Sequence, residues 1–234
     1  MLPVEKREAK NTTDILNVKL SEKWDRQSSK ITVIDPGNIW TVSNILSAEE
    51  CQDLIFHSQM MGYTEAPLTM GANNFIMMKD VRNNTRVIWD DHSFAEQLWQ
   101  RLKYFVPVHA KYLNNRQVPY GNNFKVLGCN ERFRFYKYQP MERFAPHYDG
   151  CFSKNVGLQI EKSFLTCIIY LNTVQEGGCT NFLDPRNQSI KCSVKPQTGN
   201  CLLFVHENYH EGALIPKDSK EVKYVIRTDI MYKN

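Results

Sequence analysis

The chain lacks several features that define whole classes of protein. It has seven cysteines, an odd number, and none of them belongs to a C-x-x-C pair, which argues against both a disulfide framework and a cysteine zinc site. It has no apolar run of about 18 residues and no signal-peptide-like N-terminus, so we expect a protein of the cytoplasm or nucleus with no membrane partner. Lysine and arginine form no long block, and with a net charge of only +4 a nucleic-acid partner is not indicated.

The composition is that of a folded protein. The chain has 234 residues, of which 42% are hydrophobic and 12% aromatic, enough for one sizeable core but few for two independent domains. Residues 1–30 are polar and are predicted to be an extension. We therefore expect a single domain over residues 31–234, with residues 31–123 as a helical support region and residues 124–234 as its β-rich core.

Two helices are predicted in the first half of the chain. Ser47 followed three residues later by Glu50 is a capping box, and it predicts a helix over about 48–61. A second helix is predicted over about 93–106, where a proline follows an apolar stripe at helical spacing, made of Phe94, Leu98, Leu102 and Phe105.

The remaining pattern is that of short strands. The β-branched run ITVI at 31–34 reads as the first strand. From about residue 124, runs rich in Phe, Tyr, Val, Ile and Thr alternate with Gly, Pro and Asn: RFRFYKY, FLTCIIYLN, CTNFL, IKCSVKP, NCLLFV and KYVIRTDIMY. Several short strands in a chain of this size predict an antiparallel sandwich or jelly roll with helices packed on one side.

The stretch HENYH at 206–210 matches the H-E-x-x-H pattern of zinc proteases. In those proteins the pattern lies inside a long helix, whereas here an apolar run precedes it and Gly212 and Pro216 follow, which predicts a strand running into a loop. No histidine follows His210, although a carboxylate could supply a third ligand. A zinc metallohydrolase therefore stays open as an alternative.

A second candidate metal site lies upstream. His147 and Asp149 form an H-x-D pattern after a predicted strand, and at strand spacing residues i and i+2 project to the same face. Two histidines and one carboxylate on one face of an octahedral ion are the ligand set of non-haem Fe(II) oxygenases. H-x-D alone is weak, because such a pair usually marks a surface turn.

From about residue 31 to the C-terminus, the chain resembles the prolyl 4-hydroxylase-like branch of the 2-oxoglutarate and Fe(II)-dependent dioxygenases. The resemblance depends on five motifs in the family's order: RFYKYQPMERFAPHYDG, SFLTCIIYLN, EGGCTNFL, KPQTGNCLLFVHENYHEGA and KYVIRTDIMY. It implies an α+β fold, a double-stranded β-helix (jelly roll, cupin-like) with N-terminal helices packed on one sheet.

The resemblance also implies the metal ligands. His147 and Asp149 match the proximal pair and His210 the distal histidine, so these three are the expected catalytic and metal-binding residues, and His206 is a neighbour rather than a ligand. The implied cofactors are Fe(II), 2-oxoglutarate as cosubstrate and O2, with ascorbate as a candidate addition.

A buried carboxylate of 2-oxoglutarate needs a basic partner, because an unpaired buried charge is unfavourable by several kcal/mol. The resemblance assigns this position to Lys223, at the start of KYVIRTDIMY, in preference to Lys220, which lies in a charged turn. Arg227 is the second candidate, on the same strand face as Lys223 by period two. The resemblance adds three further cosubstrate contacts, Tyr138, Tyr170 and Thr180.

The implied function is hydroxylation of an unactivated C–H bond, with release of succinate and CO2. The resemblance favours a prolyl residue, or another residue, of a protein or peptide substrate. The segment 78–91 resembles the border of the family's substrate groove, and its polar residues Arg82, Asn84 and Arg86 are candidate substrate-binding residues, although a solvated loop is an equal reading. A catalytically silent binding module of the same fold is the remaining alternative, but it would be expected to lack a ligand or the basic residue.

Overall fold

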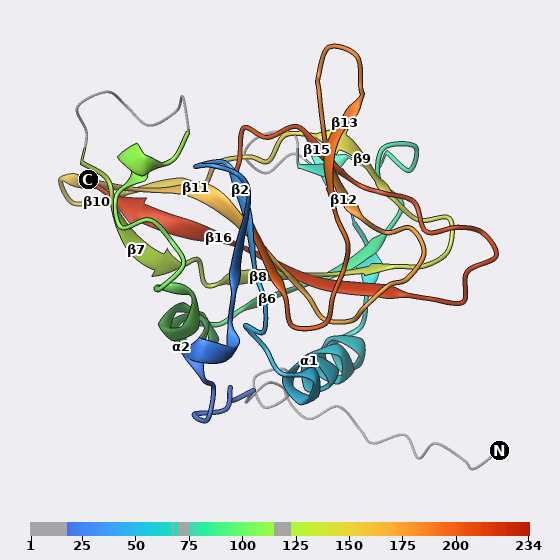
Figure 1. The fold of residues 1–234 in the computed structure, drawn as a ribbon, viewed down its shortest axis with the longest axis horizontal. Helices are drawn as coiled ribbons and strands as arrows, with labels where there is room; N and C mark the ends of the chain where they lie inside the picture. The colour runs from blue at the N-terminus through green and yellow to red at the C-terminus, as the bar shows by residue number, and fades with distance from the viewer. Residues whose placement is uncertain (1–17, 67, 70–74, 77, 115–122) are drawn as a thin grey trace.

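Two antiparallel sheets face each other and form the jelly roll (Figure 1). The structure is a computed structural model that describes the chain except for residues 1–17, 67, 70–74, 77 and 115–122. The larger sheet contains, in spatial order, β1 (Ile31–Asp35), β2 (Ile39–Val42), β14 (Cys201–Val205), β11 (Gln159–Tyr170), β16 (Lys223–Lys233), β8 (Arg132–Tyr138), β6 (Thr85–Asp90) and β3 (Thr64–Glu65). Two more strands join it, β10 (Ser153–Val156) beside β11 and β7 (Lys125–Cys129) beside β16.

The smaller sheet contains β13 (Ile190–Val194), β12 (Thr180–Leu183), β15 (His210–Gly212) and β9 (Phe144–His147), in that order. A separate short pair joins β4 (Leu68–Thr69) and β5 (Phe75–Ile76). The predicted double-stranded β-helix is confirmed, and the predicted strands of the second half all lie in it.

The helices cover one face of the larger sheet. α1 (Ala48–Met61) begins at the predicted capping box, where the Ser47 hydroxyl accepts from Glu50 N–H at 3.1 Å and the Ser47 N–H donates to the Glu50 carboxylate at 2.8 Å. α2 (His92–Leu102) ends four residues before the predicted boundary. The carbonyl of Phe105 accepts the indole N–H of Trp40 at 3.1 Å, so the chain has left the helical path there. None of the helices in the described residues is long and apolar enough to span a membrane.

Strict alternation along the central strands separates two cores. On β14, Cys201, Leu203 and Val205 pack with the helices, whereas Leu202 and Phe204 point between the two sheets. The same alternation on β16 sends Tyr224 and Ile226 toward the helices and leaves the odd positions facing the smaller sheet. This phase is why polar residues of β11 and β16 reach the interior of the jelly roll.

Residues 31–123, predicted as a helical support region, also contain strands of the larger sheet. Residues 31–123 contribute the strands β1, β2, β3 and β6 to the larger sheet in addition to the two helices. Most of the predicted extension lies outside the described residues. Its last part, residues 18–30, packs on the domain through buried Leu20 and contains the short 3-10 helix Arg26–Ser28, and a second one follows at Ala110–Tyr112.

Candidate metal centre and cosubstrate pocket

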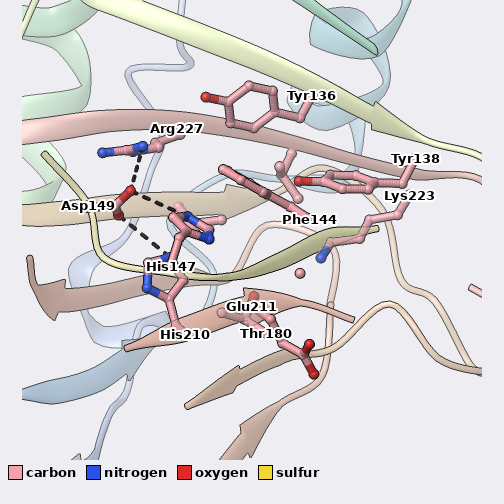
Figure 2. A pocket seen from close by; sticks show the side chains of 13 residues that line it. Tyr136, Tyr138, Phe144, His147, Asp149, Thr180, His210, Glu211, Lys223 and Arg227 are labelled. Carbon is pink, nitrogen blue, oxygen red and sulfur yellow. Dashed lines mark ion pairs between the residues drawn. The ribbon is translucent and has the colours of Figure 1, made fainter. Parts of the chain in front are cut away.

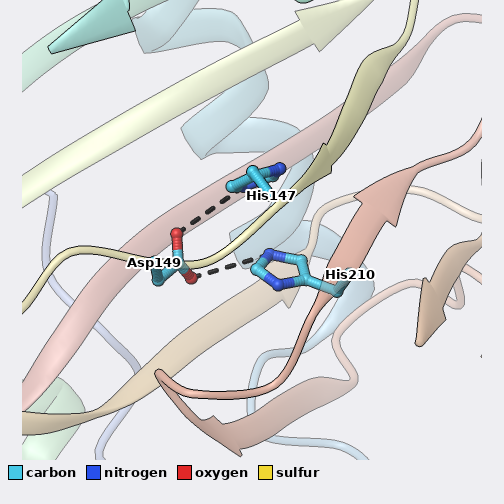
Figure 3. Close-up of side chains that lie close together, drawn as sticks. All are labelled: His147, Asp149 and His210. Carbon is cyan, nitrogen blue, oxygen red and sulfur yellow. Dashed lines mark ion pairs between the residues drawn. The ribbon is translucent and has the colours of Figure 1, made fainter. Parts of the chain in front are cut away.

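Three predicted ligands converge inside the jelly roll (Figure 3). β9 and β15 pair so that His147 and His210 are direct register partners, which places the two imidazoles side by side. Asp149 lies two residues beyond the end of β9, where its N–H donates to the carbonyl of His206 at 3.3 Å. One ligand atom from each of the three residues lies within 4.8 Å of the others, which is close enough to hold one metal ion.

In both imidazoles the hydrogen bond at Nδ1 leaves the Nε2 atom available to bind a metal ion. His147 Nδ1 lies 2.8 Å from the carbonyl of Ala145, and His210 Nδ1 lies 2.9 Å from the carbonyl of Asn208. Because a carbonyl only accepts, each Nδ1 carries the proton and each Nε2 presents a lone pair. Burial, followed by the neighbouring His210, lowers the pKa of His147 to about 3, and burial also lowers the pKa of His210. Both rings are therefore neutral at physiological pH, the state that coordinates a metal.

The carboxylate of Asp149 faces both rings and is held by two other groups. Its Oδ1 lies 3.7 Å from His147 Nε2 and its Oδ2 lies 3.6 Å from His210 Nε2. Arg227 pairs with Oδ1 at 2.7 Å, and the Thr166 hydroxyl donates to Oδ2 at 2.6 Å. Burial opposes ionisation, but the Arg227 guanidinium outweighs it and holds the pKa of Asp149 below its usual range. The site therefore contains an anionic ligand between two neutral ones.

The His147 ring is also fixed from behind by stacking. Phe144 stacks on it with the ring centroids 3.6 Å apart and an interplanar angle of 18°. The Arg82 guanidinium covers the Phe144 ring at 4.3 Å and the Tyr136 ring at 4.4 Å. Asn84 accepts from Arg82 Nε at 2.8 Å. The stack therefore links β9 to the segment before β6.

The stack contains two of the three predicted substrate-binding residues, Arg82 and Asn84. The structure buries Arg82 and Asn84, which are 5% and 1% exposed, so neither lies in a solvated loop. Arg86 is half-buried on β6, opposite Thr64 and Tyr136. Contact of these three residues with a substrate stays a prediction.

A pocket extends from the three ligands toward Lys223 (Figure 2). Lys223 is 3% exposed, and its Nζ donates to the carbonyl of Gly178 at 2.6 Å. Within the part of the chain that the structure describes, no acidic side chain forms an ion pair with it. Burial lowers the pKa of Lys223 to about 8. An unpaired ammonium at the end of a pocket fits a carboxylate ligand. Lys220, the alternative, is exposed.

The other predicted cosubstrate residues surround the same pocket. Tyr138 and Thr180 line it, and Tyr170 lies behind Thr180, with the two hydroxyl oxygens 2.8 Å apart. Burial raises the pKa of both tyrosines, so their phenols are protonated and can donate. Arg227 also lines the pocket, but its guanidinium lies against Asp149 rather than beside Lys223.

Other pocket residues were not anticipated from the sequence. They are Tyr136, Phe144, Ile168, Glu211, Gly212 and Val225. Thr166, which bonds Asp149, was also missed. The alternation of SFLTCIIYLN already puts Thr166, Ile168 and Tyr170 on one face, and that signal could have found Thr166 once Tyr170 was assigned to the pocket.

The geometry of HENYH does not match a zinc protease. His206 follows the end of β14 and His210 begins β15, so the two histidines belong to a strand, a turn and a strand rather than to a helix. The His206 ring contacts Thr166 and Ser163 and turns away from the ligand group. The segment HENYH is therefore not helical, whereas the H-E-x-x-H pattern of zinc proteases lies in a helix.

Comparisons with known proteins point to one superfamily. Residues 133–228 match the family model described as the 2OG-Fe(II) oxygenase superfamily. Prolyl 4-hydroxylase 13 of Arabidopsis thaliana is 31% identical over 84 residues, which cover 32% of this chain. The match spans only 31% of that relative, about a third of its length.

Solved prolyl hydroxylases share the fold. The viral collagen prolyl hydroxylase of Paramecium Bursaria Chlorella virus-1, in its 2OG complex, aligns with a TM-score of 0.53 and 17% identity, covering 83% of this chain and 96% of that one. A Pseudomonas putida prolyl-4-hydroxylase aligns with a TM-score of 0.55 and 14% identity, covering 82% of this chain and 92% of that one. A Trichoplax adhaerens prolyl hydroxylase, in complex with a hypoxia inducible factor peptide fragment, aligns with a TM-score of 0.56 and 15% identity, covering 83% of each chain.

Proposed function

We infer that this chain, whose residues 133–228 match the 2OG-Fe(II) oxygenase superfamily and part of which is similar to a prolyl 4-hydroxylase, is a 2-oxoglutarate and Fe(II)-dependent hydroxylase of protein or peptide substrates. The family implies Fe(II), 2-oxoglutarate and O2. The observation that carries the proposal is the group of His147, Asp149 and His210, beside a pocket with the buried Lys223, whose ammonium group bonds a backbone carbonyl and no acidic side chain of the described residues. Two neutral imidazoles and one carboxylate are the donor set of non-haem Fe(II) oxygenases.

In this proposal each side chain has a defined part. The Nε2 atoms of His147 and His210 and the carboxylate of Asp149 hold the metal. Lys223 binds the far carboxylate of 2-oxoglutarate through an ion pair, for which its ammonium group has N–H donors besides the one that bonds the Gly178 carbonyl. Tyr138 and Thr180, whose side chains line the pocket, are the proposed donors to the same carboxylate. Phe144, Ile168 and Val225 supply apolar walls that limit water in the pocket.

When bound, Fe(II) and 2-oxoglutarate supply the oxidative chemistry: O2 is consumed, succinate and CO2 are released, and one oxygen atom enters a C–H bond of the substrate. The protein's part is to hold ligands and cosubstrate in place and to exclude water, so no side chain is required as a general base. Ascorbate is a candidate addition to the reaction.

A prolyl residue of a protein or peptide is the proposed target. It is supported by the prolyl 4-hydroxylase relative and by the Trichoplax structure, which holds a hypoxia inducible factor peptide. Arg82, Asn84 and Arg86 remain the proposed contacts to that peptide. Mass spectrometry of proline-containing peptides incubated with the loaded protein tests the target, since hydroxylation adds one oxygen atom to the modified residue.

The first test needs no substrate. The metal-free full chain is titrated anaerobically with Fe(II) and then with 2-oxoglutarate, and the visible charge-transfer band of the chelate is followed. We expect the band in the wild type and its loss in His210→Ala, while Lys223→Ala needs far more 2-oxoglutarate to reach it. Absence of a band in the folded wild type contradicts the proposal.

The same titration separates the alternatives. A zinc metallohydrolase predicts tight zinc binding that depends on His206 and no response to 2-oxoglutarate. A silent binding module predicts the band without any succinate formed once O2 is admitted. Succinate formation above that of His210→Ala distinguishes the hydroxylase from both.

A further inference from the structure

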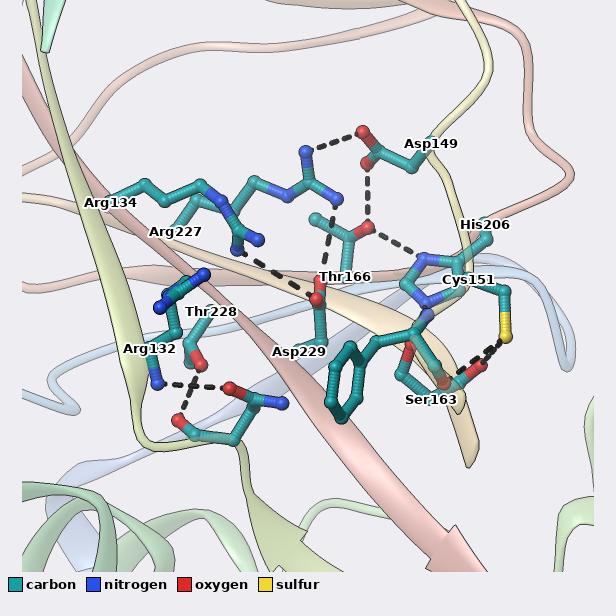
Figure 4. Close-up of polar contacts among 12 residues, drawn as sticks. Arg132, Arg134, Asp149, Cys151, Ser163, Thr166, His206, Arg227, Thr228 and Asp229 are labelled. Atoms are coloured by element: carbon teal, nitrogen blue, oxygen red, sulfur yellow. Dashed lines mark hydrogen bonds and ion pairs between the residues drawn. The ribbon is translucent and has the colours of Figure 1, made fainter. Parts of the chain in front are cut away.

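A chain of three side chains runs behind Asp149, on the side away from the two histidine ligands (Figure 4). Thr166 Oγ1 lies 2.6 Å from Asp149 Oδ2 and 2.9 Å from His206 Nδ1. His206 Nε2 in turn lies 2.9 Å from Ser163 Oγ. Ser163, Thr166 and His206 are 0%, 0% and 1% exposed, so water does not compete for these bonds. His206, the first histidine of HENYH, is thus connected to the Asp149 carboxylate through the Thr166 hydroxyl.

The proton positions along this chain follow from donor counting. The Asp149 carboxylate pairs with the Arg227 guanidinium and acts as an acceptor, so the proton in its short contact belongs to the Thr166 hydroxyl. The Thr166 hydroxyl has one proton, which it donates to Asp149, and it therefore accepts from His206 Nδ1–H. The His206 ring is 1% exposed and lies between two hydroxyl groups, so we assign it as neutral, with Nε2 accepting from the Ser163 hydroxyl. Ser163 Oγ accepts the N–H of Phe152 at 2.9 Å. All three side-chain donors point toward Asp149.

This directionality matters because of where Asp149 lies. It is beyond the end of β9, so no strand pairing fixes its backbone on that side. Its own N–H donates to the carbonyl of His206, and its Oδ2 is reached from the ring of the same residue through Thr166. His206 therefore constrains both the main chain and the carboxylate of Asp149, and bonds of this kind in one line polarise one another.

We propose that Thr166 and His206 are positioning residues for the metal ligand Asp149: the hydrogen-bond chain from Ser163 through His206 to Thr166 orients its carboxylate toward His147 and His210. The proposal rests on the proposed function for the identity of the metal. It gives His206 a defined tautomer, with the proton on Nδ1, and makes the Thr166 hydroxyl, rather than its bulk, the group on which metal affinity depends.

The tautomer is read without metal. Long-range ¹H–¹⁵N correlation spectra of the metal-free full chain, with His206 assigned through His206→Gln, report which ring nitrogen carries the proton. We expect Nδ1–H in the wild type and in Thr166→Ser. In Thr166→Val, Nδ1 loses its acceptor while Nε2 can still donate to Ser163, so we expect the proton to move to Nε2. A wild-type ring protonated on Nε2 overturns the proposal.

Metal affinity is read separately, by anaerobic Fe(II) titration of the same proteins. Loss of an outer hydrogen bond to a metal ligand typically weakens binding about 10- to 100-fold. We expect that loss in Thr166→Val and an affinity close to the wild type in Thr166→Ser, which keeps the hydroxyl. Equal affinity of a folded Thr166→Val and the wild type overturns the proposal. If the wild type binds no Fe(II), the proposed function fails, and with it the metal part of this proposal, whereas the tautomer result still decides the hydrogen-bond chain.

Discussion

Arg227 Nη1 lies 2.7 Å from Asp149 Oδ1, which places a permanent positive charge against a carboxylate that is proposed to bind a cation. The guanidinium also pairs with Asp229 at 3.3 Å, and Asp229 is reached by Arg134 at 3.8 Å (Figure 4). In the metal-free protein, Arg227 therefore neutralises a buried charge that the metal ion would otherwise balance.

Replacing Arg227 with methionine is expected to destabilise the metal-free protein by about 3–5 kcal/mol, because a buried carboxylate loses its partner. Saturating Fe(II), added anaerobically, should stabilise Arg227→Met more than the wild type, since the ion takes over part of the neutralisation. Urea unfolding with and without metal measures both effects. Arg134→Met is the control, since its longer and partly exposed pair should be worth less than about 1 kcal/mol. Equal losses in the two variants would contradict this account of Arg227.

Binding of 2-oxoglutarate is expected to weaken at alkaline pH through Lys223. Its pKa is lowered by burial from 10.5 to about 8, and only the charged ammonium pairs with a carboxylate. Above about pH 8 the affinity should fall by up to about tenfold per pH unit. Calorimetric titration with 2-oxoglutarate, using the Mn(II)-loaded protein, measures the profile. Lys223→Arg, whose guanidinium stays charged, should give a flat profile over this range.

The same lowered pKa has an opposite effect on the stability of the ligand-free protein. Between about pH 8 and 10.5, the unfolded chain keeps a proton on this lysine that the folded chain has lost. The free energy of unfolding should therefore rise with pH across that window, by up to about 1.4 kcal/mol per unit. Comparing the wild type with Lys223→Met isolates the contribution, and a difference that does not change with pH would argue against the shifted pKa.

The parts of this structure that were predictable are those that depend on local pattern. The start of α1 follows from Ser47 and Glu50, which are three residues apart. The strand β8 coincides with RFRFYKY because its alternation is readable within seven residues. The clustering of His147, Asp149 and His210 was predictable for a different reason: the three residues occur in motifs whose order resembles that of a known family, although spacing alone left them ambiguous.

What was not predictable depends on partners distant in the chain. Arg82 reads as a polar loop residue, yet it is buried because a bridge to Phe144 brings two aromatic rings over its guanidinium. Asp149 was expected to share a strand face with His147, but it lies past the strand end and is placed by His206 and Thr166 instead. Neither arrangement has a signature in nearby sequence.

Glu50 does more than cap α1, and its removal should be strongly destabilising. Its carboxylate accepts both Nη groups of Arg101, at 2.7 and 2.8 Å, and the N–H of Ser21 at 2.6 Å. The pair joins α1 to α2 and to the segment before β1, and its side chains are only 5% and 11% exposed. We expect Glu50→Ala to lower the free energy of unfolding by about 3–5 kcal/mol. Asp90→Ala, which breaks a bidentate but exposed pair with Arg132, should lower it by less than about 1 kcal/mol.

Two glycines with left-handed backbone offer a matched test of how the chain enters β14. Gly199 has φ of +77°, and its carbonyl accepts the N–H groups of both Ile45 and Leu46. A Cβ added there would lie 2.0 Å from the carbonyl oxygen of Leu46, a backbone atom of the residue whose N–H makes one of those bonds. Gly62, at the end of α1, has φ of +84°, and among the described residues no atom beyond its chain neighbours lies within 4 Å of such a Cβ.

Gly62→Ala should therefore show only the conformational penalty, about 1–2 kcal/mol. Gly199→Ala meets the same penalty and must also push the Leu46 carbonyl away, which breaks the link between β14 and the segment leading into α1. We expect a loss at least about twice as large, at the upper end of single-substitution effects. Because β14 leads directly to His206, Gly199→Ala should also weaken Fe(II) binding while Gly62→Ala leaves it unchanged. Chemical denaturation and anaerobic titration of the two variants decide the point, and similar losses in both would show that the close approach at Gly199 is relieved without consequence.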